Sequence, residues 1–263
     1  MSAEMKSRTA VVLAAGKGTR MKSDLPKVAF PLLDHPMIEH VLENLRLAGI
    51  KRIVVVVGYR KEDVTAIVEN WKKNFSDLHI EYALQEEQKG TGHALLCTES
   101  IVKNMPGCVI VTSGDMPLIQ PETFVSLLDE HEKKGNEATV LSAILDHPRG
   151  YGRLVRDSSG KLLRITEEKD ADEKTKLIRE VNSGTYVFNS PDVFRVIKNI
   201  GSANAQNEYY LPDVISLYRQ EGKEVGSLAS SNENECKGAN SVDELKELED
   251  LIRSGEIRVR VRA

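Results

Sequence analysis

The chain has 263 residues, of which 40% are hydrophobic and 29% are charged, a composition typical of a folded globular protein with one large α/β domain or two small ones. Its formal net charge of −4 argues against a nucleic-acid partner, because proteins that coat nucleic acid carry a basic excess. The longest apolar run, residues 53–57, is too short to cross a bilayer, and residues 1–6 lack the apolar stretch of a signal peptide. We therefore expect a cytoplasmic protein with no membrane partner. Cys97, Cys108 and Cys236 have no C-x-x-C spacing and are interpreted as packing residues.

The first predicted strand, residues 9–13, leads into a loop rich in glycine and cations. Gly16 and Gly18 lie in this loop. Its four cations are Lys17, Arg20, Lys22 and Lys27. Glycine lets backbone N–H groups approach an anion, and the cations concentrate positive potential at the same place. The loop therefore predicts a phosphate site; the alternative is an ordinary turn with solvated lysines.

The spacing of this loop excludes two common phosphate-binding motifs. A Walker A loop requires G-x-x-x-x-G-K followed by Ser or Thr, and that string is absent. The dinucleotide fingerprint G-x-G-x-x-G fails at its third glycine, because Met21 stands where close packing requires no side chain.

Helices and strands alternate through the next hundred residues. Apolar periodicity predicts helices over 37–47, 61–71 and 91–100. Buried strands are predicted over 53–58, 79–84 and 108–112. This alternation indicates an α/β fold with a mostly parallel sheet and helices on both faces.

A second group of glycines follows the strand over 79–84, in the string Gln85-Glu86-Glu87-Gln88-Lys89-Gly90-Thr91-Gly92-His93. An amide such as Gln85 can both donate to and accept from a nucleobase edge, so the segment suits a base pocket. A helix N-terminus capped by Thr91 explains it equally well. His93 has no visible acidic or cysteine partner and is interpreted as structural.

An acidic residue follows the strand over 108–112, in the string Ser113-Gly114-Asp115-Met116-Pro117. Ligands of open α/β sheets bind at the carboxyl ends of strands. The Asp115 carboxylate is therefore placed to hold Mg²⁺ against substrate phosphates. The alternative is a turn or cap residue before Pro117.

From residue 138 the predicted strands become short and are joined by turns. Strands over 138–145, 153–156 and 162–166 indicate a hairpin region added to the sheet, and another strand covers 181–188. Helices are predicted over 192–197, 210–219 and 243–252, the last of them exposed, and 230–235 is polar and weakly structured. Polar groups that suit a sugar occur over 150–153, 166–170 and 181–184. The charge run over 167–172 is, by itself, typical of a solvated surface.

Taken in order, these segments resemble the uridyltransferase domain of the bacterial N-acetylglucosamine-1-phosphate uridyltransferases. The resemblance runs from about Thr9 to Asn240 and rests on LAAGKGTRM, DLPK, EQKGTGHA, SGDMPLI, GYGRL, EEKDA, VNSGTYVF, NAQNEYYLPD and KGAN. It implies a Rossmann-like nucleotidyltransferase fold with a sugar-binding hairpin region. The implied reaction transfers a uridylyl group from UTP to N-acetyl-α-D-glucosamine 1-phosphate and releases pyrophosphate.

The resemblance also implies roles for individual residues. Arg20 and Lys27 would meet the phosphates and act in catalysis. The nucleotide would be held by Leu13, Ala14, Ala15, Gly16, Lys27, Gln85, Gly90 and Thr91. The sugar would be contacted by Gly114, Gly152, Glu167 and Asn182. Mg²⁺, the implied cofactor, would be held by Asp115 and Asn240.

The chain departs from that family in two places. Most members have Tyr-Gly-Asp where this chain has Ser113-Gly114-Asp115, which leaves the sugar preference open. The family's second half is a left-handed β-helix that acetylates glucosamine 1-phosphate and builds the trimer. Residues 241–263 contain no counterpart of it, so we expect no acetyl-CoA chemistry, in either a stand-alone or a truncated enzyme, and the oligomeric state stays open. We expect a nucleotidyltransferase domain over 1–241 and a helical arm and tail over 242–263.

Three other functions compete with this reading. The nearest keeps the enzyme class but uses another sugar 1-phosphate or another NTP. A catalytically idle nucleotide sensor would have no need of the metal pair Asp115 and Asn240. An NAD-dependent oxidoreductase is disfavoured by Met21.

Overall fold

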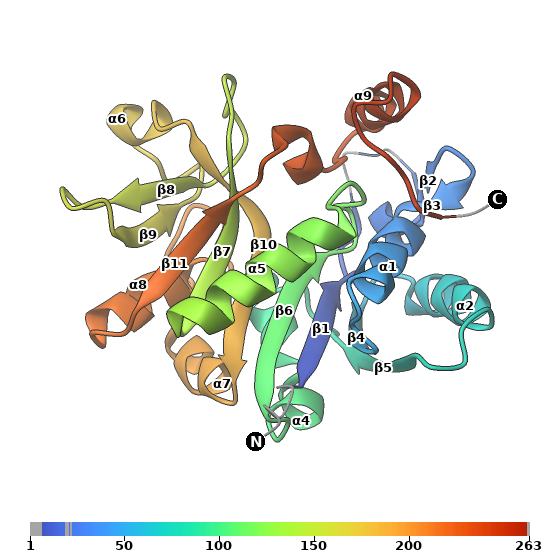
Figure 1. The fold of residues 1–263 in the computed structure, drawn as a ribbon, viewed down its shortest axis with the longest axis horizontal. Helices are drawn as coiled ribbons and strands as arrows, with labels where there is room; N and C mark the ends of the chain where they lie inside the picture. The colour runs from blue at the N-terminus through green and yellow to red at the C-terminus, as the bar shows by residue number, and fades with distance from the viewer. Residues whose placement is uncertain (1–6, 19–20, 22, 262–263) are drawn as a thin grey trace.

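One mixed sheet forms the centre of the molecule (Figure 1). The computed structural model describes residues 7–18, 21 and 23–261. Within them the strand order is β11-β7-β10-β6-β1-β4-β5, with β8 beside β10 and β9 beside β8. The strands are β1 (Arg8–Leu13), β4 (Arg52–Val57), β5 (His79–Leu84), β6 (Gly107–Ser113), β7 (Ala138–Ile144), β8 (Arg153–Arg156), β9 (Leu162–Thr166), β10 (Glu180–Ser190) and β11 (Val225–Ala229). A separate hairpin consists of β2 (Pro31–Leu32) and β3 (His35–Pro36).

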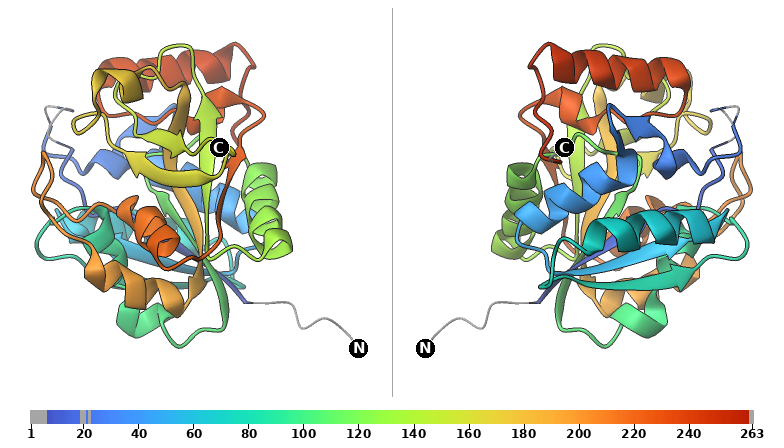
Figure 2. Two further views of the ribbon diagram at one scale, coloured as in Figure 1. Left: turned by 90° about the vertical axis from the view of Figure 1, so that its left-hand side faces the viewer. Right: turned by 90° about the vertical axis from the view of Figure 1, so that its right-hand side faces the viewer.

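Helices cover both faces of the sheet, as Figure 2 shows. The α-helices are α1 (Met37–Leu47), α2 (Lys61–Lys72), α3 (Thr91–Leu96), α4 (Glu99–Val102), α5 (Pro121–Lys134), α6 (Glu173–Lys176), α7 (Asp192–Val196), α8 (Asp213–Gln220) and α9 (Val242–Arg253). The short 3-10 helices are η2 (Lys27–Ala29), η3 (Ile197–Asn199) and η4 (Glu233–Cys236). Successive side chains of a strand point to opposite faces. Accordingly, Ala10 and Val12 belong to the core with α1, α2 and α5, whereas Val11 belongs to the core with α3, α4, α7 and α8. The predicted α/β fold is confirmed.

The order of the strands determines where a ligand can enter. Strands β1, β4, β5 and β6 are parallel, whereas β10 is antiparallel to β6 and β7. After β1 the chain passes through α1 to β4, and after β6 it passes through α5 to β7, on the other side of β1. The two connections therefore diverge from the carboxyl ends of neighbouring strands. The carboxyl ends of β1 and β6 thus lie side by side, at the edge of the sheet where open α/β folds bind their ligands.

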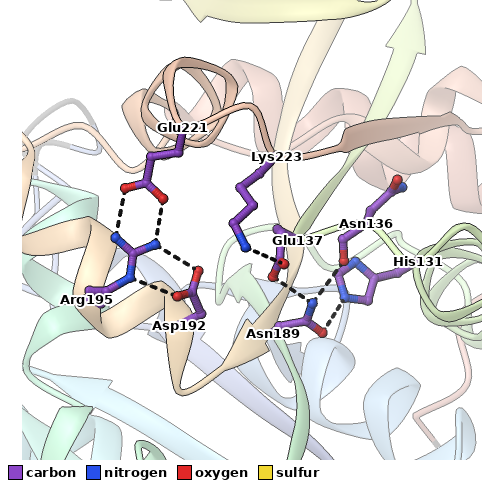
Figure 3. A network of polar contacts seen from close by, with 8 residues as sticks. All are labelled: His131, Asn136, Glu137, Asn189, Asp192, Arg195, Glu221 and Lys223. Atoms are coloured by element: carbon purple, nitrogen blue, oxygen red, sulfur yellow. Dashed lines mark hydrogen bonds and ion pairs between the residues drawn. The ribbon is translucent and has the colours of Figure 1, made fainter.

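A network of polar side chains ties the elements together at the other end of the sheet (Figure 3). Asn189 lies near the end of β10, next to the start of β6. Its amide donates to the Glu137 carboxylate at 3.0 Å and contacts the His131 ring at 3.2 Å. Beside it, Arg195 of α7 binds both Asp192 and Glu221. This network joins α5, the segment before β7, β10, α7 and the segment after α8, far from the carboxyl ends of β1 and β6, so we interpret it as structural.

Helix α9 forms where the sequence predicts a helix, but the expectation that it is exposed is wrong. Leu245 and Leu248 are buried in a cluster with Met21, Leu32 and Met37. The helix therefore packs against the hairpin β2–β3 and against Met21 of the cationic loop. Whether 242–263 form a unit separate from 1–241 stays a prediction.

Two further predicted elements differ from the structure. The helix over 91–100 is divided into α3 and α4, because the chain turns at Thr98, whose hydroxyl donates to the Leu95 carbonyl at 2.7 Å. The helix over 210–219 begins only at Asp213, after Pro212. Strand β11 was not predicted, since Val-Gly-Ser-Leu-Ala has neither a long apolar run nor a clear alternation. No helix of the described residues is long and apolar enough to cross a membrane.

Candidate active site

A cavity of about 860 Å³ opens beside the carboxyl ends of β1 and β6. The predicted site residues in its wall are Leu13, Thr91, Gly152, Glu167, Asn182 and Asn240. The other predicted residues that the structure describes are not part of this wall: Ala14, Ala15, Gly16, Lys27, Gln85, Gly90, Gly114 and Asp115. Arg20 lies outside the described residues, so its catalytic role stays a prediction.

Three predicted residues from distant parts of the chain meet at one edge of the cavity. Lys27 is the first residue of η2, Asp115 follows β6 and Asn240 precedes α9. The Lys27 ammonium donates to the Asp115 carboxylate, and it donates to Asn240 Oδ1 at 2.6 Å. We call these three residues the Lys27 cluster. It places one cation and two oxygen acceptors together.

The Asp115 carboxyl is ionised in this cluster. Burial alone would raise its pKa, but the Lys27 ammonium and a hydrogen bond from the Ser113 hydroxyl hold the pKa of Asp115 below its ordinary value. Asp115 and Asn240 thus direct a carboxylate and an amide oxygen to the same point, and both are ligand types that Mg²⁺ prefers. Among the described residues no group of three or more His, Cys, Asp or Glu could hold a metal ion. A site on this pair would therefore need water and substrate phosphates as further ligands.

The glycine-rich loop begins directly at the end of β1. Ala14 donates its N–H to the Val56 carbonyl at 2.9 Å, and the Ala15 carbonyl accepts from Tyr59 at 3.1 Å. Gly18 has a φ of +67°, and a Cβ there would lie 2.6 Å from Cβ of Lys27. The glycine therefore lets the loop fold against the residue that carries the ammonium of the Lys27 cluster. By contrast, a Cβ at Gly16 would meet no atom within 4 Å.

Hydrogen bonds within the predicted base-binding segment join its residues to one another. Gln85 is buried, and its amide donates to the Gly90 carbonyl at 3.1 Å and contacts His93 at 3.2 Å. The Thr91 hydroxyl accepts from the backbone N–H of Leu211 at 3.1 Å and makes no cap to its own helix. The alternative interpretation of Thr91 as a helix cap is therefore wrong. Gln85 lines another, smaller cavity of about 440 Å³, so the cavity beside β1 and β6 does not include every predicted nucleotide residue.

We expect Gly90→Ala to destabilise the protein by about 2 kcal/mol or more. Gly90 has a φ of +104°, and a Cβ there would lie 2.7 Å from the Tyr209 carbonyl oxygen. Urea denaturation measures the change in the free energy of unfolding. Gly16→Ala is the matched control, because it meets no atom within 4 Å. Equal stability of the two variants would contradict the prediction.

The predicted sugar residues Gly152, Glu167 and Asn182 lie next to one another. The Asn182 N–H donates to the Gly152 carbonyl at 2.9 Å, and a Cβ at Gly152 would lie 3.0 Å from Oε1 of Glu167. The Asn182 amide donates to the Tyr186 hydroxyl at 2.7 Å and accepts from the Gly184 N–H at 2.9 Å. The fourth predicted sugar residue, Gly114, lies apart from them, packed against Val28.

Glu167 does not behave as part of a solvated charge run. Burial, together with the charges of Asp213 and Asp170, raises the pKa of Glu167 to about 7, and Arg153 and Asn182 only partly oppose this. The interpretation of 167–172 as a solvated surface is therefore wrong for its first residue. A carboxyl that titrates near neutral pH in the cavity wall is a candidate for ligand binding.

The raised pKa of Glu167 gives a pH-dependent stability with a defined sign. A carboxyl whose pKa is higher in the folded than in the unfolded state binds more protons when folded. Its contribution to the free energy of unfolding therefore falls as pH rises from about 4.5 to 7. We expect Glu167→Gln to equal the wild type in stability at pH 5 and to exceed it by on the order of 2 kcal/mol at pH 8. Urea denaturation at both pH values checks this. An equal difference at the two pH values would show that Glu167 is not responsible.

Several residues of the cavity were not predicted as site residues. Arg149 and Lys237 line it, as do Tyr186 and Glu244. Arg149 and Lys237 lie in the segments after β7 and before α9, whereas Tyr186 belongs to β10 and Glu244 to α9. Arg153, in a segment predicted to suit a sugar, is instead buried and pairs with Glu168 at 2.7 Å.

Comparisons with known proteins agree with this geometry. The family model for nucleotidyl transferases matches residues 9–233. The bifunctional protein GlmU of Bacillus velezensis is 44% identical over 236 residues, which cover 90% of this chain and 50% of that protein. The bifunctional protein GlmU of Oceanobacillus iheyensis is 41% identical over 249 residues, which cover 95% of this chain and 53% of that protein. The chain thus spans about half the length of the curated relatives it matches.

Solved structures share the fold at low sequence identity. A putative glucose-1-phosphate thymidylyltransferase from Bacillus anthracis superposes with a TM-score of 0.77 at 20% identity, covering 97% of this chain and 98% of that one. A UDP-glucose pyrophosphorylase complexed with UDP-glucose gives the same TM-score of 0.77 at 20% identity, covering 94% of this chain and 99% of that one. These likenesses establish the Rossmann-like architecture. Together with the family model, which matches most of the sequence, they lead to one conclusion: the chain belongs to the nucleotidyl transferase family.

Proposed function

We propose that this protein transfers a uridylyl group from UTP to N-acetyl-α-D-glucosamine 1-phosphate, giving UDP-N-acetylglucosamine and pyrophosphate. The observation that carries the proposal is the position of the Lys27 cluster at the edge of the cavity whose wall holds Glu167 and Asn182. The cluster expected to bind phosphates therefore lies next to the residues expected to bind the sugar. The order of the motifs along the chain supports the choice of uridine and of the amino sugar.

The reaction needs little proton transfer. A phosphate monoester has a second pKa of about 6, so the sugar phosphate is already ionised at neutral pH. One of its oxygens attacks the α-phosphorus of UTP, a new P–O bond forms, and the bond to the β-phosphate oxygen breaks. The electron pair leaves with pyrophosphate. The protein must therefore bring two polyanions together and stabilise the charge that spreads over the phosphates.

The Lys27 ammonium is the described group best suited to this work. It is held by Asp115 and Asn240 at the carboxyl edge of β6, and the glycines beside it allow phosphates to approach the backbone. Arg20, in the same loop, would add a second charge. Asp115 and Asn240 would hold Mg²⁺, and when bound the ion supplies charge neutralisation on phosphate oxygens.

The sugar would be oriented mainly by Glu167. The Asn182 amide is engaged by Tyr186 and Gly184 and also hydrogen-bonds the Glu167 carboxyl, so Asn182 orients this carboxyl in the cavity wall for a sugar hydroxyl. Ser113 also lines the cavity, and its small hydroxyl donates to Asp115. A small side chain at this position leaves room for more than one sugar substituent.

The test is a grid of four NTPs against several sugar 1-phosphates, with pyrophosphate release as the readout and with Mg²⁺ or EDTA present. We expect UTP with N-acetylglucosamine 1-phosphate to exceed every other pair by at least about tenfold, and EDTA to abolish the signal. A different best pair would replace the substrate assignment within the same enzyme class. Nucleotide binding without pyrophosphate release from any pair would instead indicate a nucleotide sensor.

A further inference from the structure

The side chain of Asn240 is oriented by a residue of the helix that follows it. Oε2 of Glu244 accepts from the side-chain amide of Asn240 at 3.0 Å and from its backbone N–H at 2.6 Å. Opposite, Oδ1 of Asn240 accepts from the Lys27 ammonium at 2.6 Å. Asn240 is therefore fixed between the Glu244 carboxylate on one side and the Lys27 ammonium on the other.

This contact is not the usual one for a glutamate in the first turn of a helix. Ser241 caps α9 by accepting from the Glu244 N–H at 3.2 Å. In a capping box the glutamate three residues later reaches back to the N–H of the cap residue itself. Here Glu244 reaches one residue further, to the backbone and the side chain of Asn240. Its carboxylate thus serves the residue at the cavity edge as well as the helix.

The orientation of the Asn240 amide decides what it presents to the cluster. The oxygen and the NH₂ group of an amide are similar in shape but opposite in hydrogen bonding. A carboxylate can only accept, so Glu244 holds the NH₂ end and leaves the oxygen end toward Lys27 and Asp115. With the amide turned by 180°, a donor would face a place suited to cations.

The rest of α9 keeps Glu244 in position. The next residue, Leu245, and Leu248 one turn later are buried with Met21 and Leu32. The helix is therefore anchored on the flank of the glycine-rich loop, while Glu244 faces the cavity. This arrangement fixes the carboxylate relative to both the loop and Asn240.

We propose that Glu244 is a positioning residue that directs the oxygen of Asn240 toward the Mg²⁺ site. The proposal rests on the proposed function, since it assigns Asn240 to the metal. Residues that orient metal ligands from behind commonly account for 10–100-fold in metal affinity or activity. Glu244 itself does not touch the reacting atoms.

The first test compares Glu244→Ala with Asp243→Ala. Asp243 is the exposed acid beside it in the first turn of α9, so its loss reproduces the change in charge at the helix N-terminus without the contact to Asn240. Binding of Mn²⁺, alone and with UDP-N-acetylglucosamine, is followed by electron paramagnetic resonance. We expect Glu244→Ala and Asn240→Ala to weaken Mn²⁺ binding by about tenfold or more, and Asp243→Ala to bind as the wild type does. Equal binding by Glu244→Ala and Asp243→Ala, or a wild type that binds no Mn²⁺, would overturn the proposal.

A second test stays informative if Glu244→Ala does not fold. Asn240→Asp removes the donor and places a carboxylate at residue 240 against the carboxylate of Glu244. Because the two repel each other, the side chain of residue 240 loses its orientation, and we expect at least about a tenfold loss in Mn²⁺ affinity. Glu244→Gln added to it restores a donor beside residue 240, so the double variant should recover most of that loss. A double variant no better than Asn240→Asp would contradict the positioning role. Because the readout is metal binding, an inactive wild type in the substrate grid would count against the proposed function alone.

Discussion

Asp115→Ala is expected to lower turnover by at least about 100-fold, the scale observed when one transition-state stabilising group is removed. The carboxylate is the only acidic member of the Lys27 cluster, and it is held ionised beside Lys27 and Ser113. Without it the cluster keeps one oxygen acceptor, Asn240 Oδ1, and loses the negative charge that both a metal ion and the ammonium require. Pyrophosphate release under saturating substrates gives the turnover, and circular dichroism establishes that the variant is folded.

Two further substitutions should lower turnover less than Asp115→Ala does. Ser113→Ala removes only the hydroxyl that donates to Asp115, and we expect a loss of no more than about tenfold. Asp115→Asn keeps an oxygen but no charge, so its turnover should lie between that of Ser113→Ala and that of Asp115→Ala. Turnover of Asp115→Ala within a few-fold of the wild type would remove Asp115 from the mechanism.

The parallel half of the fold is predictable because its signals are local and strong. Continuous runs of β-branched residues such as 53–57 are typical of buried strands, and the helices between them show a clear periodicity, so the alternation indicates a parallel sheet. Strand β11 shows the limit of this reasoning. It lies at the edge of the sheet beside β7, where a strand is held by backbone pairing and needs few apolar side chains.

The site was predictable only where a motif carries it. Lys27, Asp115 and Asn240 are far apart in sequence, and spacing alone gives no reason for them to meet; the resemblance to a known family grouped them, and the structure brings them into contact. Glu244 was not predicted, because a glutamate three residues after a serine at a helix start is typical of an ordinary capping box. Its contact with Asn240 depends on how α9 docks. The burial of Leu245 and Leu248, which docks it, is a tertiary property.

Lys27→Met is expected to lower turnover by at least about 100-fold and also to destabilise the protein. The ammonium is the cation that pairs with the Asp115 carboxylate, and both side chains are only 15% exposed. Removing one partner of a buried ion pair leaves the other charge uncompensated, at a cost of about 3 kcal/mol. Methionine keeps the aliphatic stem that packs against Gly18, so the change is confined to the charge. Urea denaturation and pyrophosphate release measure the two effects separately.

The double variant Lys27→Met/Asp115→Asn distinguishes catalysis from stability. With both charges gone, no unpaired ion remains, and replacing both partners of a buried pair is often nearly neutral. We therefore expect the double variant to regain most of the free energy of unfolding that Lys27→Met loses. Its turnover should stay at least about 100-fold below that of the wild type, because the group that neutralises phosphate charge is still missing. Recovery of turnover together with stability would mean that Lys27 only compensates Asp115 and takes no part in the departure of pyrophosphate.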